Sequence, residues 1–165
     1  MSTDCSQPAI RKEQEDLSVD LSAFAKGYAV DEAAELLVAD NYKNFLVEIG
    51  GELRMRGVNA AGKRWAIAIE SPVSESRSVD SVLKLTNAAV ATSGDYRNFY
   101  EIDGQQYSHT IDPDTGKPVI HNGAAVTVVT DSAAEADALA TALLVMGPET
   151  GLAFATTEDL AAYFL

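Results

Sequence analysis

The chain has 165 residues, of which 47% are apolar and 22% are charged. This length suits one domain that can bury a sizeable core, and the single cysteine, Cys5 in a polar segment, excludes an internal disulfide. Twelve basic residues against twenty-five acidic ones give a net charge of −13, which disfavours nucleic-acid binding because such a surface repels phosphate backbones. No apolar run approaches the roughly 20 residues of a membrane span.

The first part of the chain predicts a tail, a helix and two strands. Residues 1–19 are polar and charged, and we expect a tail without a secretory signal. Apolar residues then recur at helical spacing, which predicts a helix over about 23–40. The run 44–49 favours a strand, Gly50-Gly51 favours a sharp bend, and 52–57 favours a second strand.

Strand signals dominate the middle of the chain. Residues 64–70 alternate large apolar residues with alanine, which indicates a strand, and further strands are expected at 82–85, 88–92 and 124–130. The runs 96–102 and 105–111 flank Asp103-Gly104, a pair that tolerates the positive φ angles of a hairpin turn. A second turn is expected at 112–116, where Pro and Gly occupy turn-favouring positions.

The clearest helix is expected at 132–146. Ser132 with Glu135 three residues later has the form of a capping box, and Gly147-Pro148 ends the helix. A short helix from Pro148 to about residue 155 and a strand at 160–165 complete the chain. The order of helix, many strands, two helices and a strand predicts an α+β domain, with a mainly antiparallel sheet and packed helices.

Asp137 and Thr141 form the first candidate site. They lie four residues apart on the capped helix, so both side chains project from one face about one turn apart. A carboxylate and a hydroxyl at this spacing, flanked by alanines, suit a hard cation that prefers oxygen ligands. The alternative is a solvated aspartate and a threonine bonded to its own helix.

His109 and Asp112 form the second candidate site, at the end of a hairpin strand beside a turn rich in carboxylates. A nearby carboxylate would hold one imidazole tautomer and raise basicity, as general-base chemistry requires. Asp112, just before Pro113, is alternatively a turn residue that bonds its own backbone. His121 is interpreted as a loop residue.

Three glycine-containing segments could approach a phosphate closely: Ala25-Lys26-Gly27, Gly50-Gly51 and Ser93-Gly94. None has the spacing of a P-loop or a dinucleotide motif, and bends in a sheet explain them equally well. Lys26 near a helix start, and Arg97, are each either phosphate contacts or members of surface ion pairs.

Five ordered blocks of this sequence together resemble the ApbE family. Residues 20–31 (DLSAFAKGYAVD), 46–53 (LVEIGGEL), 91–98 (ATSGDYRN), 108–118 (SHTIDPDTGKP) and 136–143 (ADALATAL) match its signature segments. The resemblance implies an ApbE-like, T-fold-related domain over residues 20–165. Because relatives extend further at both ends, we expect this to be the C-terminal portion of the family's full-length fold.

Members of this family are FAD:protein FMN transferases, which cleave FAD, release AMP and attach FMN by a phosphoester to Thr or Ser of a flavoprotein. The resemblance implies Mg²⁺ as the cofactor, FAD as substrate and such a flavoprotein subunit as partner. Asp137, Thr141 and the backbone carbonyl of Ala25 fall on metal ligands, and His109 falls on the proposed base. The resemblance also implies a flavin and phosphate pocket formed by the blocks that contain Lys26, Gly50, Gly51, Ser93, Gly94 and Asp112.

Several expectations stay open at the level of sequence. Water instead of an acceptor hydroxyl would make the chain a Mg²⁺-dependent FAD pyrophosphatase, and a third alternative is a non-catalytic flavin-binding or partner-binding module. A second copy of the chain could complete the pocket. Relatives suggest a periplasmic or membrane-anchored location, but the sequence carries no signal for it, so the cytoplasm also stays open.

Overall fold

The computed structural model describes residues 2–4, 9–72, 78–94, 99–102, 105–120 and 123–165. Its centre is a five-stranded sheet in the order β13-β12-β7-β4-β3, and every neighbouring pair in it is antiparallel. The strands are β3 (Phe45–Ile49), β4 (Glu52–Arg56), β7 (Ala88–Gly94), β12 (Ala125–Thr130) and β13 (Ala161–Phe164). The predicted α+β class with a mainly antiparallel sheet is confirmed.

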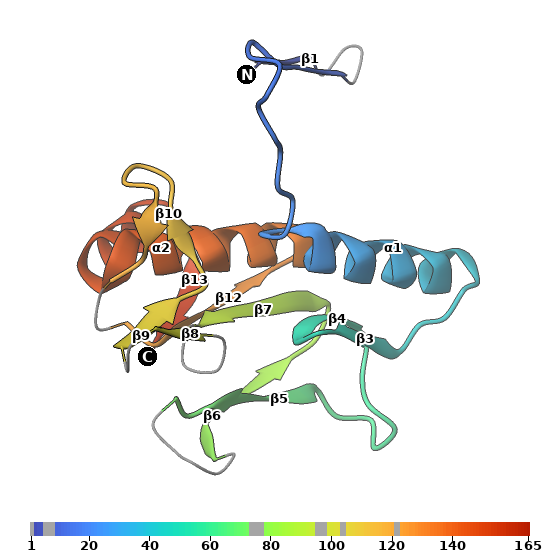
Figure 1. The fold of residues 1–165 in the computed structure, drawn as a ribbon. Helices are drawn as coiled ribbons and strands as arrows, with labels where there is room; N and C mark the ends of the chain where they lie inside the picture. The colour runs from blue at the N-terminus through green and yellow to red at the C-terminus, as the bar shows by residue number, and fades with distance from the viewer. Residues whose placement is uncertain (1, 5–8, 73–77, 95–98, 103–104, 121–122) are drawn as a thin grey trace.

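Two helices, α1 (Ala25–Ala39) and α2 (Ala133–Thr157), cover one face of this sheet (Figure 1). Alanines on α2 bring it close to β7 and β12, where Ala136 and Ala140 pack in a core with Val126 and Val128. A smaller cluster of Val30, Ala89 and Ala133 joins α1, the sheet and the start of α2. The helix layer therefore rests on small residues that allow close approach.

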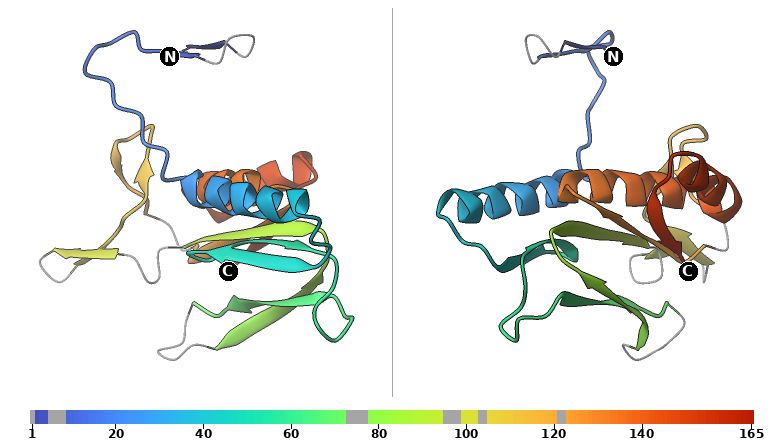
Figure 2. Two further views of the ribbon diagram at one scale, coloured as in Figure 1. Left: turned by 90° about the vertical axis from the view of Figure 1, so that its right-hand side faces the viewer. Right: turned by 180° about the vertical axis from the view of Figure 1, so that it is seen from behind.

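A hairpin lies on the opposite face of the sheet (Figures 1 and 2). It consists of β5 (Trp65–Glu70) and β6 (Val79–Leu85), which pair antiparallel. Met55 and Val90 from the sheet pack against Ile67 of this hairpin. The sheet is thus buried on both faces, with helices above and the hairpin below.

The two-helix prediction at the C-terminal end is confirmed. Ser132 is the N-cap of α2, where its Oγ accepts a hydrogen bond from the Glu135 backbone N–H at 3.3 Å. α2 is broken at Gly147, directly before Pro148. The φ of 77° and ψ of 169° at Gly147 are not helical. By length and composition alone α2 could cross a membrane, a test that the core helices of globular proteins also pass. Its buried face, however, packs on the sheet.

Six short strands form three further hairpins. They are β1 (Ser2–Asp4) with β2 (Ala9–Arg11), β8 (Phe99–Ile102) with β9 (Gln105–Ser108), and β10 (Ile111–Asp112) with β11 (Lys117–Pro118). The segment expected to be a plain tail therefore contains a small two-stranded sheet, which stands apart from the layered body in Figure 1. Each of these two strands has only three residues, which is too short for a recognisable alternation of apolar and polar residues.

The strand predicted over 105–111 is wrong in its second half. It stops at Ser108, whose Oγ accepts the Thr110 backbone N–H at 2.9 Å and so turns the chain. Ile111 pairs instead with Pro118 in the next hairpin. The Asp103-Gly104 turn, Arg97 and His121 lie outside the described residues.

Candidate functional site

The first turns of α1 and α2 lie against each other, and from there the helices run in opposite directions (Figure 2). The contact depends on Gly27, which is buried in α1. A Cβ atom at this position would lie 2.1 Å from the carbonyl oxygen of Ala133, well inside van der Waals contact. Only glycine permits this approach, so the AKG segment is positioned by packing.

Asp137 is buried at this contact, with 3% of its surface exposed. Its Oδ2 accepts a hydrogen bond of 3.0 Å from the backbone N–H of Gly27. That N–H belongs to the first turn of α1, where donors have no partner within the helix, and the Phe24 N-cap supplies no side-chain bond. Ala25 begins the same turn, so the structure brings two of the three predicted metal ligands to one place.

A second carboxylate, on α1, accepts hydrogen bonds from the first turn of α2. Asp31 of α1 accepts hydrogen bonds from the backbone N–H groups of Ala133 and Ala134, each at 3.0 Å, and from Ser132 Oγ at 2.7 Å. Arg54 of β4 donates to it at 3.0 Å. Burial would raise the pKa of Asp31, but the hydrogen bonds and the Arg54 charge outweigh burial and hold that pKa below its ordinary value. We call this exchange of carboxylates between the two helix starts the reciprocal cap.

Thr141 is half-buried one turn after Asp137, as the spacing predicts. Its Oγ1 lies 3.0 Å from Ser93 Oγ, and either hydroxyl could donate. Ser93 is at the end of β7, followed by Gly94, which pairs with Ala125 across the sheet. The hydroxyl of Thr141 is therefore bonded to a neighbouring strand and not, as in the alternative interpretation, back to its own helix.

Lys26 connects the helix start to the sheet. Its Nζ lies 2.6 Å from Oε1 of Glu52, and the lysine side chain is 49% exposed while that of Glu52 is 2% exposed. Burial raises the pKa of Glu52; the hydrogen bond and charge of Lys26 oppose the shift, and the charge of Asp137 adds to it. Sequence reasoning missed Glu52. The available signal was an acidic residue directly after Gly50-Gly51, at the start of a predicted strand.

Gly50 and Gly51 form the bend between β3 and β4, with φ angles of 64° and 106° that favour glycine. A Cβ at Gly50 would lie 3.3 Å from Lys26 Cδ and 3.5 Å from Glu52 Oε2. The predicted site residues Lys26, Gly50, Asp137, Thr141, Ser93 and Ala25 thus gather through a chain of contacts around the start of α1.

His109 and Asp112 lie in the segment that holds β9 to β11. His109 is exposed between β9 and β10. Asp112 accepts bonds from the Asp114 backbone N–H at 2.8 Å and from Thr115 Oγ1 at 2.9 Å, so the turn interpretation of Asp112 is confirmed. These bonds, the backbone one first, hold the pKa of Asp112 below its ordinary value.

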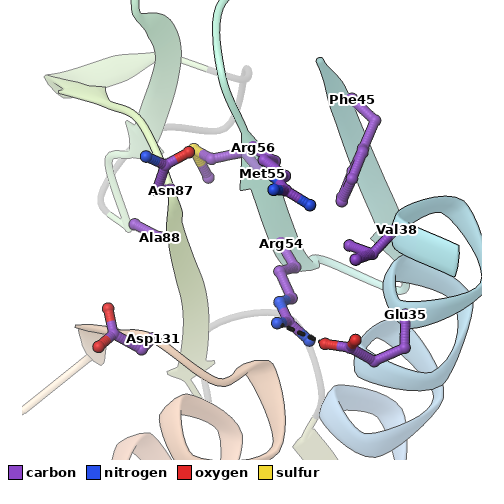
Figure 3. Close-up of a pocket in the computed structure, with 9 residues that line it drawn as sticks. All are labelled: Glu35, Val38, Phe45, Arg54, Met55, Arg56, Asn87, Ala88 and Asp131. Carbon is purple, nitrogen blue, oxygen red and sulfur yellow. Dashed lines mark ion pairs between the residues drawn. The ribbon is translucent and has the colours of Figure 1, made fainter. Parts of the chain in front are cut away.

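The structure also contains a cavity of about 390 Å³ that includes none of the predicted site residues. It is lined by the far end of β4, by α1 and by the turn before β7, as Figure 3 shows. Arg54 crosses it to pair with Glu35 at 2.8 Å. Among the described residues, no group of three or more His, Cys, Asp or Glu side chains has a metal-binding arrangement.

Comparisons with known proteins identify the family. The sequence profile of the ApbE family matches residues 1–164, which include the segment expected to be a tail. A curated relative from Vibrio cholerae, named FAD:protein FMN transferase, is 47% identical over 151 residues, covering 92% of this chain and 45% of the relative. One from Escherichia coli K12 with the same name is 42% identical over 159 residues, covering 96% and 45%.

Solved structures give the same result. The flavin transferase ApbE from Vibrio cholerae superposes with a TM-score of 0.83 at 44% identity, over 93% of this chain and 48% of that one. The apo form of Pseudomonas stutzeri flavinyl transferase ApbE gives 0.77 at 47% identity, over 88% and 45%. The chain spans about half the length of the relatives it matches. From the profile match and these identities, the chain belongs to the ApbE family.

Proposed function

We propose that this chain carries the Mg²⁺-dependent chemistry of FAD:protein FMN transfer: cleavage of FAD, release of AMP and attachment of FMN to a Thr or Ser hydroxyl of an acceptor flavoprotein. The observation that carries the proposal is the convergence of Asp137, Thr141, Ser93 and Lys26 at the start of α1. Relatives that share this stretch of sequence are named for that reaction.

Asp137, Thr141 and the carbonyl of Ala25 would hold the ion. They fit because all three donors are oxygens, which Mg²⁺ and Mn²⁺ prefer, and because the buried Asp137 carboxylate of α2 is hydrogen-bonded to the first turn of α1, which Ala25 begins. When bound, the ion would stabilise negative charge on the phosphates of FAD, against the repulsion of a protein with net charge −13.

Phosphate binding would fall to the residues around the ion. Lys26 is held at Glu52 by one contact and is half exposed, so its ammonium can still donate to a phosphate oxygen. Gly50 and Gly51 have no side chains and let a ligand approach the bend between β3 and β4. Ser93 and Gly94, at the end of β7, would contribute a hydroxyl and backbone on the other side.

His109 would take the proton from the acceptor hydroxyl, which is a weak nucleophile until it loses that proton. Its exposed position between two small hairpins supports this role, because a protein acceptor needs access from outside. Asp112 is occupied by its own turn and would shape the loop that carries His109. The oxygen of the hydroxyl forms the new bond to phosphorus of FMN, and AMP leaves with the bridging oxygen.

The test incubates the chain with FAD and Mg²⁺, with and without an acceptor peptide, and follows AMP and flavin-labelled peptide by mass spectrometry. We expect both products only with acceptor and Mg²⁺. Asp137→Asn keeps an oxygen for the Gly27 N–H but removes the charge, so it should abolish turnover, whereas Glu149→Gln at an exposed position on α2 should leave it unchanged.

Other outcomes would point to one of the alternatives. AMP without acceptor would indicate a pyrophosphatase. FAD binding with no turnover, unchanged by His109→Ala, would indicate a non-catalytic module. If activity is second order in chain concentration and light scattering reports a dimer, the pocket is completed by a second copy.

A further inference from the structure

Glu52 has an oxygen without a partner. The residue is 1% exposed, and while Oε1 contacts Lys26, Oε2 is buried and has no hydrogen-bond partner among the residues that the structure describes. Leaving a buried acceptor unsatisfied costs about 1–3 kcal/mol, and more for a charged group. Such an atom in a folded protein calls for a donor or a cation that binds there.

The groups around Oε2 supply no second cation. Gly50 lies beside this oxygen, since a Cβ there would lie 3.5 Å from Oε2 and 3.3 Å from Lys26 Cδ. Lys26 is committed to Oε1 and lies at the exposed edge. Arg54, two residues along β4, is engaged elsewhere, with Asp31 and Glu35. Among the described residues, therefore, no second cation approaches this oxygen.

Asp137 adds a second buried carboxylate to the same place. It is 3% exposed, and its charge is close enough to act on Glu52. Two buried carboxylates and one half-exposed ammonium leave a net negative charge out of contact with water. Buried charges of this kind are paired or coordinate a metal ion, because an isolated one is too costly. A divalent cation would offset both.

We propose that Glu52 is a further acidic residue of the divalent-ion site, where Oε2 binds the ion or a water molecule held by it, in addition to Asp137. The inference rests on the proposed function, since it concerns the same ion. It assigns Lys26 as the counter-charge that keeps Glu52 in place, and it explains a buried glutamate directly after the Gly50-Gly51 bend.

The rival explanation is that Glu52 only positions Lys26. The two can be separated because they predict different effects of breaking the ion pair from either side. If Glu52 acts only through Lys26, then Glu52→Gln and Lys26→Met should change ion affinity alike. If Glu52 itself binds the ion, Glu52→Gln should weaken binding while Lys26→Met, which removes a nearby positive charge, should strengthen it.

The experiment titrates Mn²⁺ into the full chain without FAD and measures free Mn²⁺ by electron paramagnetic resonance. We expect Glu52→Gln to raise the Kd about 10- to 100-fold, and Lys26→Met to lower it. Glu48→Gln, at an exposed position on the neighbouring strand β3, is the matched control and should leave it unchanged. The midpoint of thermal unfolding, with and without Mn²⁺, gives a second readout: stabilisation by the ion should be lost in Glu52→Gln.

Each result has one meaning. If wild type binds Mn²⁺, Asp137→Asn does not, and Glu52→Gln binds as wild type does, the inference is wrong and the proposed metal site stands. If wild type binds no Mn²⁺, the metal site of the proposed function fails, and this inference fails with it. If Glu52→Gln does not fold, a Lys26→Met variant with unchanged or weaker affinity overturns the inference by itself.

Discussion

Asp31→Ala removes one half of the reciprocal cap, and its cost can be worked out from the contacts. The carboxylate accepts four hydrogen bonds, from Ser132, Ala133, Ala134 and Arg54. Loss of the acceptor at a helix start costs about 1 kcal/mol and up to 2. Loss of the Ser132 bond costs about 1 kcal/mol, and loss of the partly exposed Arg54 pair costs up to about 1 kcal/mol because Glu35 remains as a partner.

The expected loss of stability is thus about 3 kcal/mol in the free energy of unfolding. For a chain of this size, each kcal/mol moves the thermal midpoint by about 2–4 °C, so Asp31→Ala should melt about 6–12 °C lower. Asp31→Asn keeps one acceptor oxygen and should lose roughly half as much. Urea unfolding measures the free energy and a thermal melt measures the midpoint, both followed by far-ultraviolet circular dichroism. Glu32→Ala, at the exposed neighbouring position on α1, is the control and should stay within about 0.5 kcal/mol.

The same carboxylate predicts a pH dependence. Because the pKa of Asp31 is lowered in the folded state, its stabilisation is fully present above the unfolded aspartate value of about 3.9. It is lost as pH falls through the lower, folded-state value. The gap in stability between wild type and Asp31→Asn should therefore narrow on acidification below about pH 4. A loss smaller than about 1 kcal/mol for Asp31→Ala, or a gap that does not change with pH, would refute the reasoning.

Three further predictions concern the same region. Gly27→Ala places a methyl group 2.1 Å from the Ala133 carbonyl and should cost more than about 3 kcal/mol in a thermal melt, against about 1 for Gly62→Ala, where the space is open but φ is 70°; equal costs would contradict it. Ser132→Ala should cost about 1 kcal/mol in urea unfolding, and no change would rule out the cap. Thr141→Val should weaken Mn²⁺ binding about 10-fold in the resonance titration; wild-type affinity would remove Thr141 from the ligand set.

Local signals in the sequence were sufficient for most of the fold. Gly147-Pro148 breaks α2 because proline removes a backbone donor and Gly147 takes a φ of 77°, both of which act within a few residues. The Gly50-Gly51 bend depends likewise on its own backbone angles. The β1–β2 sheet was missed because it is too short for any periodic pattern, and strand 105–111 was overextended because Ser108 turns the chain through its hydroxyl.

The site was only partly predictable, because several of its contacts join residues that are far apart in the sequence. Asp137 and Thr141 lie one turn apart on a helix, which spacing reveals. Lys26 and Glu52 are 26 residues apart in sequence, and Gly27 and Asp137 are 110 apart. No local pattern contains those contacts, because they arise only when the sheet and the two helices have packed. Glu52 was therefore missed: the sequence shows an acidic residue directly after Gly50-Gly51, but its burial and its contact with Lys26 arise only in the folded structure.

The reciprocal cap also has a consequence for motion. The amide of Gly27 is bonded to α2, and the amides of Ala133 and Ala134 are bonded to α1, so neither helix can fray at its start without releasing an acceptor on the other. In native-state hydrogen exchange these three amides should open together as one cooperative unit, with a common dependence on denaturant. If the substrate binds at this contact, the two helix starts beside it would be as resistant to local opening as the buried core.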